Sequence, residues 1–228
     1  MNNQPTISTS NKSIAVLPFV NMSTDVENEY FSDGITEEII NALTTIKGLK
    51  VIARTSSFAF KNKNIDIRTI GNQLGVSTVL EGSVRKAKNR VRVTAQLIST
   101  DDGTHFWSKN FDRELEDIFS LQDEISILLA DQIRENFGHI EIPSVLHATP
   151  THNIKAYDLW LKGSYHLKRK DFEDIKAAMK FFKAAIKADP NYSEAYAYLG
   201  EAYIQAAAFN MFPNDEGNNL ARIAAKRA

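Results

Sequence analysis

Apolar and polar residues follow two different periods along the first part of the chain. Residues 13–19 are almost continuously apolar, which is typical of a short strand buried on both faces. Between residues 90 and 100 apolar and polar positions alternate, which predicts a half-buried strand. Residues 117–137 place Ile118 and Leu121 on one apolar stripe at helical spacing, which predicts a long amphipathic helix.

The order of these elements predicts the fold class of residues 12–138. The first strand, a helix capped by Ser32 or Asp33, and a strand at 49–53 form a β-α-β unit. A second helix, capped by Asp66, leads into three consecutive strands and then the long helix. We therefore predict an α/β domain with a mixed (α+β) sheet and helices packed on it. The three consecutive strands are expected at 78–86, 90–100 and 104–112.

The residues on either side of this domain have a different composition. Residues 1–11 are polar and have no apolar signal core, so we expect a flexible lead-in. Residues 139–152 contain Pro143 and Pro150 and show little periodicity, which indicates a linker. Residues 153–228 show only helical periodicity, which predicts an all-α region.

The helical region carries small, aromatic and proline residues in a register that resembles the tetratricopeptide (TPR) repeat. Small residues let paired helices approach closely, and aromatic residues fill the space between them. An ordinary four-helix bundle would share the apolar periodicity but not this register. We predict TPR helical hairpins of about one and a half to two repeats, truncated at the C-terminal end. The matching residues are Ala178, Phe182, Ala185, Pro190, Tyr196, Leu199, Gly200 and Tyr203.

Several longer stretches of residues 12–138 closely resemble a bacterial family. They are SIAVLPFVNMS, ENEYFSDGITEEI, VIARTSSFAF, VLEGSVRKAKNRVRVTAQLIS and FDRELEDIFSLQDEI. They resemble the TolB amino-terminal-like domain that precedes TPR arrays. In that family the pair lies C-terminal to adenylate cyclase, serine/threonine kinase or winged-helix DNA-binding domains, sometimes just after a membrane helix. The resemblance implies a sensory or scaffolding role, in the bacterial cytoplasm or periplasm according to whether a membrane helix precedes this fragment.

Composition and motifs argue against several kinds of chemistry. The chain has 228 residues with a formal net charge of −1, which gives no general attraction to nucleic acid or anionic lipid. It contains no cysteine, which excludes disulfides, thiolate zinc sites and cysteine nucleophiles. P-loop, G-x-S-x-G and H-E-x-x-H motifs are absent, and the five histidines lack metal-ligand spacing. We therefore expect no catalytic activity, no cofactor, no metal site and no membrane insertion by this chain.

A basic run from Arg85 to Arg92 is the best candidate for nucleic-acid binding. It lacks the interleaved aromatic residues that stack on bases, and it lies on a predicted hairpin where charge prevents aggregation. We interpret it as a solvated hairpin, and we interpret Lys61 and Lys63 in the same way. The sequence thus predicts no direct nucleic-acid partner.

Four polar residues near the predicted strand ends are candidates for a small-ligand site. Asn21 follows the first strand, Asp33 opens the first helix, and Arg54 and Ser57 follow the second strand. The carboxyl ends of parallel strands meet at one edge of a sheet, where ligands often bind. The alternative is a structural network in which Asp33 caps the helix and pairs with Arg54.

The TPR resemblance implies that the inner helix of each repeat faces a partner peptide. An exposed Trp160 beside a lysine would be an anchor for such a peptide. The alternative is that Trp160 packs against the first domain or its closing helix. The residues at the matching positions are Tyr157, Trp160, Ser164, Leu167 and Lys168 in the first repeat, and Glu194, Ala197, Glu201, Ile204 and Gln205 in the second.

These observations favour a non-catalytic protein-interaction and regulatory module of a larger bacterial signalling or transcription-regulatory protein. The alternative is a small-ligand sensor domain of a membrane-tethered adenylate cyclase or kinase. A sensor should have a concave pocket lined by its binding residues, whereas an interaction module should have its largest cleft along the repeat helices. Ala221, Ala225 and Ala228 at the open repeat end also predict a weak homodimer through the C-terminal helices.

Overall fold

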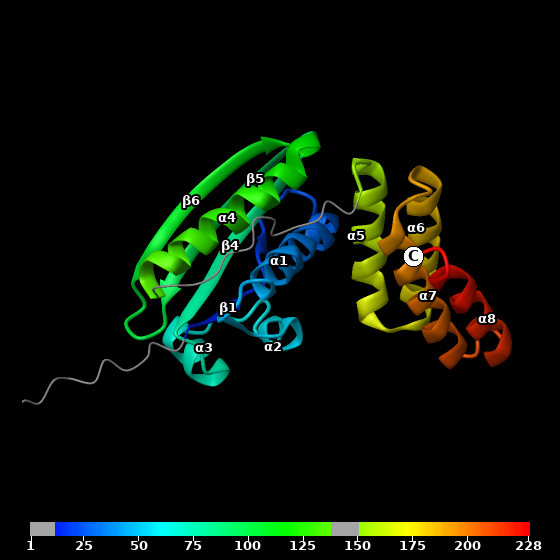
Figure 1. The fold of residues 1–228 in the computed structure, drawn as a ribbon, viewed down its shortest axis with the longest axis horizontal. Helices are drawn as coiled ribbons and strands as arrows, with labels where there is room; N and C mark the ends of the chain where they lie inside the picture. The colour runs from blue at the N-terminus through cyan, green and yellow to red at the C-terminus, as the bar shows by residue number, and fades with distance from the viewer. Residues whose placement is uncertain (1–11, 138–150) are drawn as a thin grey trace, which may run out of the picture. The chain divides into compact units, whose positions relative to one another are not determined.

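The computed structural model describes residues 12–137 and 151–228. The chain divides into two compact units, Met1–His147 and Ala148–Ala228. The first is built on a sheet and the second consists of helices (Figure 1). The predicted lead-in and residues 139–150 of the predicted linker lie outside the described residues. In the described part of the chain, no helix combines the length and the apolar character needed to cross a membrane.

The first unit contains a six-stranded sheet. The sheet is mixed, as the sequence predicts, and has one strand more than the five predicted. β1 pairs in parallel with β3 on one side and with β4 on the other, and β2 also pairs in parallel with β4. β4, β5 and β6 form an antiparallel meander. In chain order the strands are β1 (Ser13–Val16), β2 (Val20–Asn21), β3 (Lys50–Val51), β4 (Thr78–Ala87), β5 (Arg90–Ser99) and β6 (His105–Glu114).

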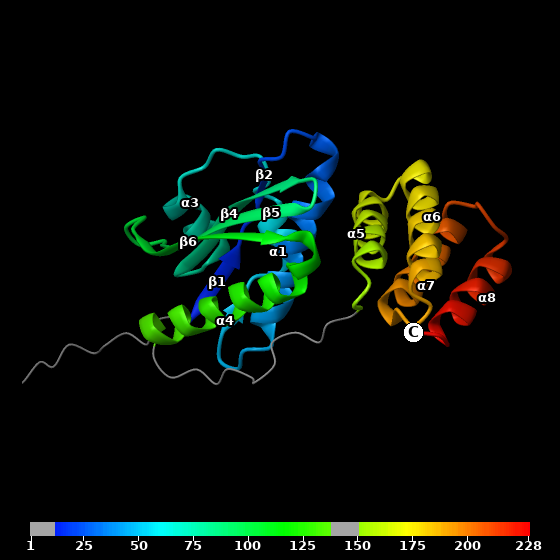
Figure 2. The ribbon, with the colours of Figure 1, turned by 90° about the horizontal axis from the view of Figure 1, so that it is seen from above.

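The two faces of this sheet differ in chemistry. α1 (Glu29–Thr44) and α4 (Ile118–Phe137) pack against each other, and α4 covers β6 and its neighbours on one face (Figures 1 and 2). Val93 and Ala95 of β5 lie on that face and are fully buried. The opposite face carries polar side chains along β5 and β6, and α3 (Ile67–Leu74) packs against β4 near its start.

The N-terminal boundary of α1 differs from the prediction. The helix begins at Glu29, so Ser32 and Asp33 lie inside it and do not cap it. Tyr30 and Phe31 are buried, which extends the apolar stripe by one turn toward the N-terminus. The prediction for α3 is confirmed, because the Asp66 side chain caps it and Gly75 ends it with a φ of 63°.

Four short elements of the first unit were not predicted. They are β2, the 3₁₀ turns η1 and η2 (Leu115–Asp117) and the short helix α2. Their residues are too few to show a period, so tertiary contacts decide their conformation. η1 spans Val26–Asn28 and α2 spans Arg54–Phe58.

The second unit is all-α, and each helix packs against the next in the chain. Asn153 and Asp171 cap the first two helices with their side-chain oxygens. A Cβ atom built on Gly163 would lie 2.5 Å from the Phe182 ring, so only glycine permits this approach of α5 to α6. The helices are α5 (Ile154–Arg169), α6 (Phe172–Ala188), α7 (Ser193–Ala208) and α8 (Asn214–Ala225).

The last helix only partly agrees with the expected exposed face of small residues. Ala221 is buried, and its carbonyl oxygen lies 3.3 Å from the position that a Cβ on Gly200 would take. Ala225 and Ala228 are exposed, as expected. The small residues at Gly200 and Ala221 thus bring α7 and α8 together.

Candidate functional site

Asp33, a predicted ligand residue, forms an ion pair inside the first unit. Its carboxylate accepts a hydrogen bond from Lys61 Nζ at 2.5 Å, and the same ammonium lies 2.8 Å from Glu29. Burial raises the pKa of Asp33, against the opposing effect of Lys61. Lys61 is only partly exposed, so its interpretation as a solvated lysine was wrong.

Arg54 and Asp33 do not form the predicted pair, since each has another partner. Arg54 Nε lies 3.2 Å from Glu37, and its guanidinium carbon lies 3.7 Å from the centre of the Phe58 ring. The ion pair joins α2 to α1, and the stacking on Phe58 lies within α2. The contacts around Asp33 and Arg54 are therefore those of a structural network, with different partners from the predicted ones.

Asn21 and Ser57, the other two predicted ligand residues, have local environments. Asn21 closes its own turn, because its side-chain oxygen accepts the amide of Ser23 and its side-chain nitrogen donates to the carbonyl of Asp25. Ser57 is fully buried, and its hydroxyl has no hydrogen-bond partner among the described residues. A ligand site at these four residues stays a prediction.

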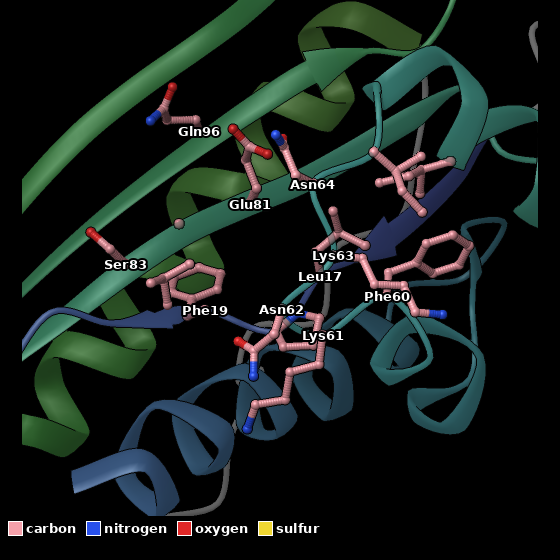
Figure 3. A pocket seen from close by; sticks show the side chains of 15 residues that line it. Leu17, Phe19, Phe60, Lys61, Asn62, Lys63, Asn64, Glu81, Ser83 and Gln96 are labelled. Carbon is pink, nitrogen blue, oxygen red and sulfur yellow. The ribbon is translucent and has the colours of Figure 1, made fainter. Parts of the chain in front are cut away.

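A cavity of about 340 Å³ lies elsewhere in the first unit, at the carboxyl end of β1. The segment after β1, the middle of β4 and β5, and the loop that follows α2 surround it (Figure 3). None of the four predicted ligand residues lines it. The apolar part of its wall comes from Leu17, Phe19, Val20, Phe60, Ile65 and Ile70.

The polar part of the cavity wall gathers at one end. Glu81 of β4 and Gln96 of β5 are direct cross-strand partners, so their side chains share one face of the sheet. Asn64 approaches Glu81 from the loop after α2 (Figure 3). Ser83, two residues after Glu81, points to the same face. Among the described residues, no hydrogen bond or ion pair of the Glu81 carboxylate is observed.

The two lysines in the cavity wall are directed elsewhere. Lys61 points away from Glu81 toward α1, where Asp33 and Glu29 hold its ammonium (Figure 3). The Lys63 ammonium lies 5.9 Å from the centre of the Phe60 ring. Glu81 therefore provides the negative charge of the cavity without a counter-charge from either lysine.

Sequence reasoning missed Glu81, Ser83, Asn64 and Gln96. The alternation in β4 and β5 does place the strand residues on the polar face, and this pattern could have identified them. The approach of Asn64 has no local signal, because it depends on how the loop folds over the sheet.

On α5, most of the predicted partner residues are buried. The Trp160 ring is packed among Tyr157, Tyr192 and Tyr198, with ring centres between 5.3 and 6.1 Å from its own. Its side chain is 7% exposed, so it is not the exposed anchor that the sequence suggested. The other residues of this set are Tyr157, Ser164 and Leu167, which are buried, and Lys168, which is half-buried.

The corresponding residues on α7 are more accessible. Ala197, Glu201 and Ile204 are exposed and share one face of the helix, and Ile204 is 55% exposed. Gln205 donates a hydrogen bond to Glu201 on the same face, and Glu194 is half-buried. We call Ala197, Glu201, Ile204 and Gln205 the α7 face. Of the two predicted partner surfaces, this one is available to a partner.

Two arginines of the basic hairpin share one carboxylate. Arg90 and Arg92 both donate hydrogen bonds to Asp112 on β6, and these bonds lower the pKa of that carboxyl. Arg85 donates to the carbonyl oxygen of Met22. Among the described residues, no group of three or more His, Cys, Asp or Glu side chains is arranged to hold a metal ion.

Comparison with protein families gives one match to the first unit. The family described as HilA/YgeH-like transcriptional regulator, second domain, matches residues 10–128. A relative named putative adenylate cyclase 3, from Rhizobium meliloti (strain 1021), is 42% identical over 187 residues. This match covers 82% of the chain but only 32% of the relative. The chain therefore spans about a third of the length of that relative.

Several solved structures partly resemble this chain. The LpoB C-terminal domain from Salmonella enterica has 17% sequence identity and a TM-score of 0.38, over 48% of this chain and 87% of that one. TolB from Acinetobacter baumannii has 14% identity and a TM-score of 0.40, over 54% and 28%. Lipoprotein GNA1162 from Neisseria meningitidis has 18% identity and a TM-score of 0.39, over 55% and 96%.

Proposed function

Since the chain belongs to the HilA/YgeH-like transcriptional regulator second-domain family, we propose that it is a non-catalytic regulatory module of a larger bacterial signalling protein. The observation that carries the proposal is that the same region is related both to a regulator domain and to a putative adenylate cyclase. The 187 matched residues outnumber those of the first unit, so the similarity to the cyclase includes part of the helical unit. We infer that a region found both in a transcriptional regulator family and in a putative adenylate cyclase regulates the domains that carry out those activities.

The helical unit supplies the partner-binding surface in this proposal. The α7 face presents the apolar Ile204 between polar side chains, an arrangement suited to a peptide that buries one apolar residue. On α5, Trp160 Nε1 and Ser164 Oγ are buried without a hydrogen-bond partner among the described residues. Because buried polar groups are normally paired, a rearrangement that exposes α5 to a partner would satisfy both. The TPR character of these hairpins belongs to the same proposal.

A ligand-sensing role for the first unit is the second candidate function. The cavity beside Glu81 favours it, because small-molecule sites are concave and combine apolar walls with a few polar groups. The two roles are compatible, since the cavity lies in the first unit and the α7 face in the second.

The regulatory role can be tested within putative adenylate cyclase 3 of R. meliloti. In one version, this chain replaces the matching segment, and in another the segment is deleted. We expect the replacement to keep cyclic AMP production within about threefold of the unaltered protein and the deletion to change it about tenfold, a typical coupling between sites. A replacement that behaves like the deletion would contradict the proposal.

Two further measurements separate regulation from catalysis and locate the partner surface. The purified chain, supplied with ATP and magnesium, should form no cyclic AMP. Ile204→Glu in the replacement should reproduce the effect of the deletion, because it places a charge on the apolar centre of the α7 face. Ile127→Glu, a change at a 50% exposed isoleucine of α4, is the matched control and should leave cyclic AMP production unchanged.

A further inference from the structure

The cavity at the end of β1 is lined by a carboxylate, Glu81, that has no counter-charge among the described residues. Glu81 is partly buried, and among the described residues no cation is paired with it. A carboxylate that loses part of its hydration is stabilised by an opposite charge in contact with it. Lys61 is held by Asp33 and Glu29, and the Lys63 ammonium lies near the Phe60 ring. A cation from outside the chain would supply this charge.

The neighbours of Glu81 determine which kind of cation fits. Gln96, Asn64 and Ser83 each offer an oxygen that accepts hydrogen bonds, and they line the same cavity as the carboxylate (Figure 3). A primary ammonium group has three N–H donors and no acceptor. It can therefore donate to Glu81 and to two of these oxygens at once, and the bond to the carboxylate is charge-assisted.

The apolar wall determines what the ammonium is attached to. Leu17 and Phe60 line the cavity on the side away from Gln96 (Figure 3). An alkyl stem fits against these side chains. A volume of about 340 Å³ is at the small end of the range for ligand pockets, which suits a small molecule.

We propose that this cavity binds a small molecule that carries a primary ammonium group on a short alkyl stem. Glu81 binds the ammonium, and Gln96, Asn64 and Ser83 orient it. Leu17 and Phe60 contact the stem. This deepens the ligand-sensing role proposed above by naming the class of ligand. It is independent of the regulatory role, because the first unit can bind such a ligand whether or not the α7 face binds a partner.

The test compares three probes of similar length on the unaltered chain. Pentylammonium and 1-pentanol have the same five-carbon stem, pentanoate has the same total number of carbons, and the three differ in the charge of the head group. Backbone amide shifts in NMR spectra locate each probe and give its dissociation constant. We expect saturable shifts with pentylammonium at Glu81, Gln96 and residues 60–65, about tenfold weaker binding of pentanol, and no binding of pentanoate.

Two variants assign the selectivity to one side chain. Glu81→Gln keeps the shape of the side chain and removes its charge, so pentylammonium should bind about tenfold more weakly. Glu114→Gln removes a carboxylate from the end of β6, outside the cavity, and should leave the dissociation constant unchanged. If Glu81→Gln unfolds the protein, the comparison of the three probes on the unaltered chain still decides the question.

Three outcomes would overturn the inference: no saturable binding of pentylammonium, pentanol or pentanoate binding as tightly as pentylammonium, or a loss smaller than threefold in Glu81→Gln. None of them bears on the regulatory role, which is measured by cyclic AMP production in the cyclase. Conversely, failure of the cyclase experiment would leave binding in the cavity intact. The two proposals can therefore fail separately.

Discussion

The two units of this chain differ in how their secondary-structure elements pack together. The helical unit brings its helices together through small residues set against large ones, as at Gly163 and Phe182. The first unit covers one face of its sheet with α4. On the other face an apolar cluster that includes Ile70 and Val79 covers the start of β4, next to polar groups and a cavity. Helices interlock through side chains that can fill the space between them, whereas a sheet has two faces that need separate cover.

This difference bears on where each unit can bind. In the first unit, the loop after α2 and the segment after β1 enclose a space over the sheet, so a small molecule has room. In the second unit, the aromatic residues of α5 fill the interior, so a partner is left the exposed surface of α7. The cavity of the first unit thus suits a small molecule, and the exposed α7 face suits a peptide or protein partner.

The largest expected effect is on the packing of the helical unit. Phe182→Ala removes a fully buried ring and should lower the free energy of unfolding of that unit by about 3–5 kcal/mol. The chain has two tryptophans, Trp107 in β6 and Trp160 in α5, so each unit has its own fluorescence probe. In a Trp107→Phe background, where Trp160 is the fluorescent tryptophan, Phe182→Ala should move the urea unfolding transition to lower urea. An equal shift of the Trp107 transition in a Trp160→Phe background would show that the units do not unfold independently.

A smaller effect is expected from adding a methyl group to the tightly packed sheet of the first unit. In Gly82→Ala, the new methyl group would lie 2.7 Å from the Phe19 ring and in conflict with the carbonyl oxygen of Thr94. Overpacking of this kind should destabilise the first unit by about 1–3 kcal/mol. The Trp107 transition should shift to lower urea and the Trp160 transition should stay. Unchanged stability of the first unit would mean that β4 and β5 can separate at low cost.

The ion pair beneath the cavity should have a pH-dependent effect. Lys61→Met leaves the partly buried Asp33 carboxylate without its main partner and should cost about 1–3 kcal/mol at pH 8. Burial already raises the pKa of Asp33, and the loss of Lys61 raises it further. In the folded variant the neutral form of the Asp33 carboxyl is favoured. The loss of free energy of unfolding caused by Lys61→Met should therefore decrease as the pH falls from 8 toward 5. Urea unfolding at both pH values measures this, with Lys63→Met as the control. A cost independent of pH would exclude Asp33 as its origin.

The smallest expected effect is weak self-association through the helical unit. Ile204 and Ile223 are 55% and 51% exposed there, and pairing of two copies would cover them. Sedimentation velocity over a range of concentrations should show a monomer–dimer equilibrium that Ile204→Glu with Ile223→Glu abolishes. Ile127→Glu changes an isoleucine of similar exposure in the first unit and should leave the equilibrium intact. A monomer at every concentration would rule the prediction out.

Local patterns in the sequence by themselves determined the regular elements of this protein. Alternation, clearest in β5, predicts the meander, because neighbouring residues of a strand point to opposite faces and one face is more buried than the other. Asp66 and Gly75 delimit α3, since capping depends on a few neighbouring residues. The all-α character of the last 75 residues or so follows from helical spacing in the same way.

The tertiary structure alone decided which side chains meet. Lys61 pairs with Asp33 because α2 and its loop pack beside α1, and nothing within either segment encodes that contact. Trp160 is buried because Tyr157 of α5, Tyr198 of α7 and Tyr192, which precedes α7, surround it. Its position in the repeat leaves exposure and packing both open. The cavity beside Glu81 forms where β4, β5 and a loop from between α2 and α3 converge. Such sites depend on contacts between residues far apart in the chain, which a local pattern does not contain.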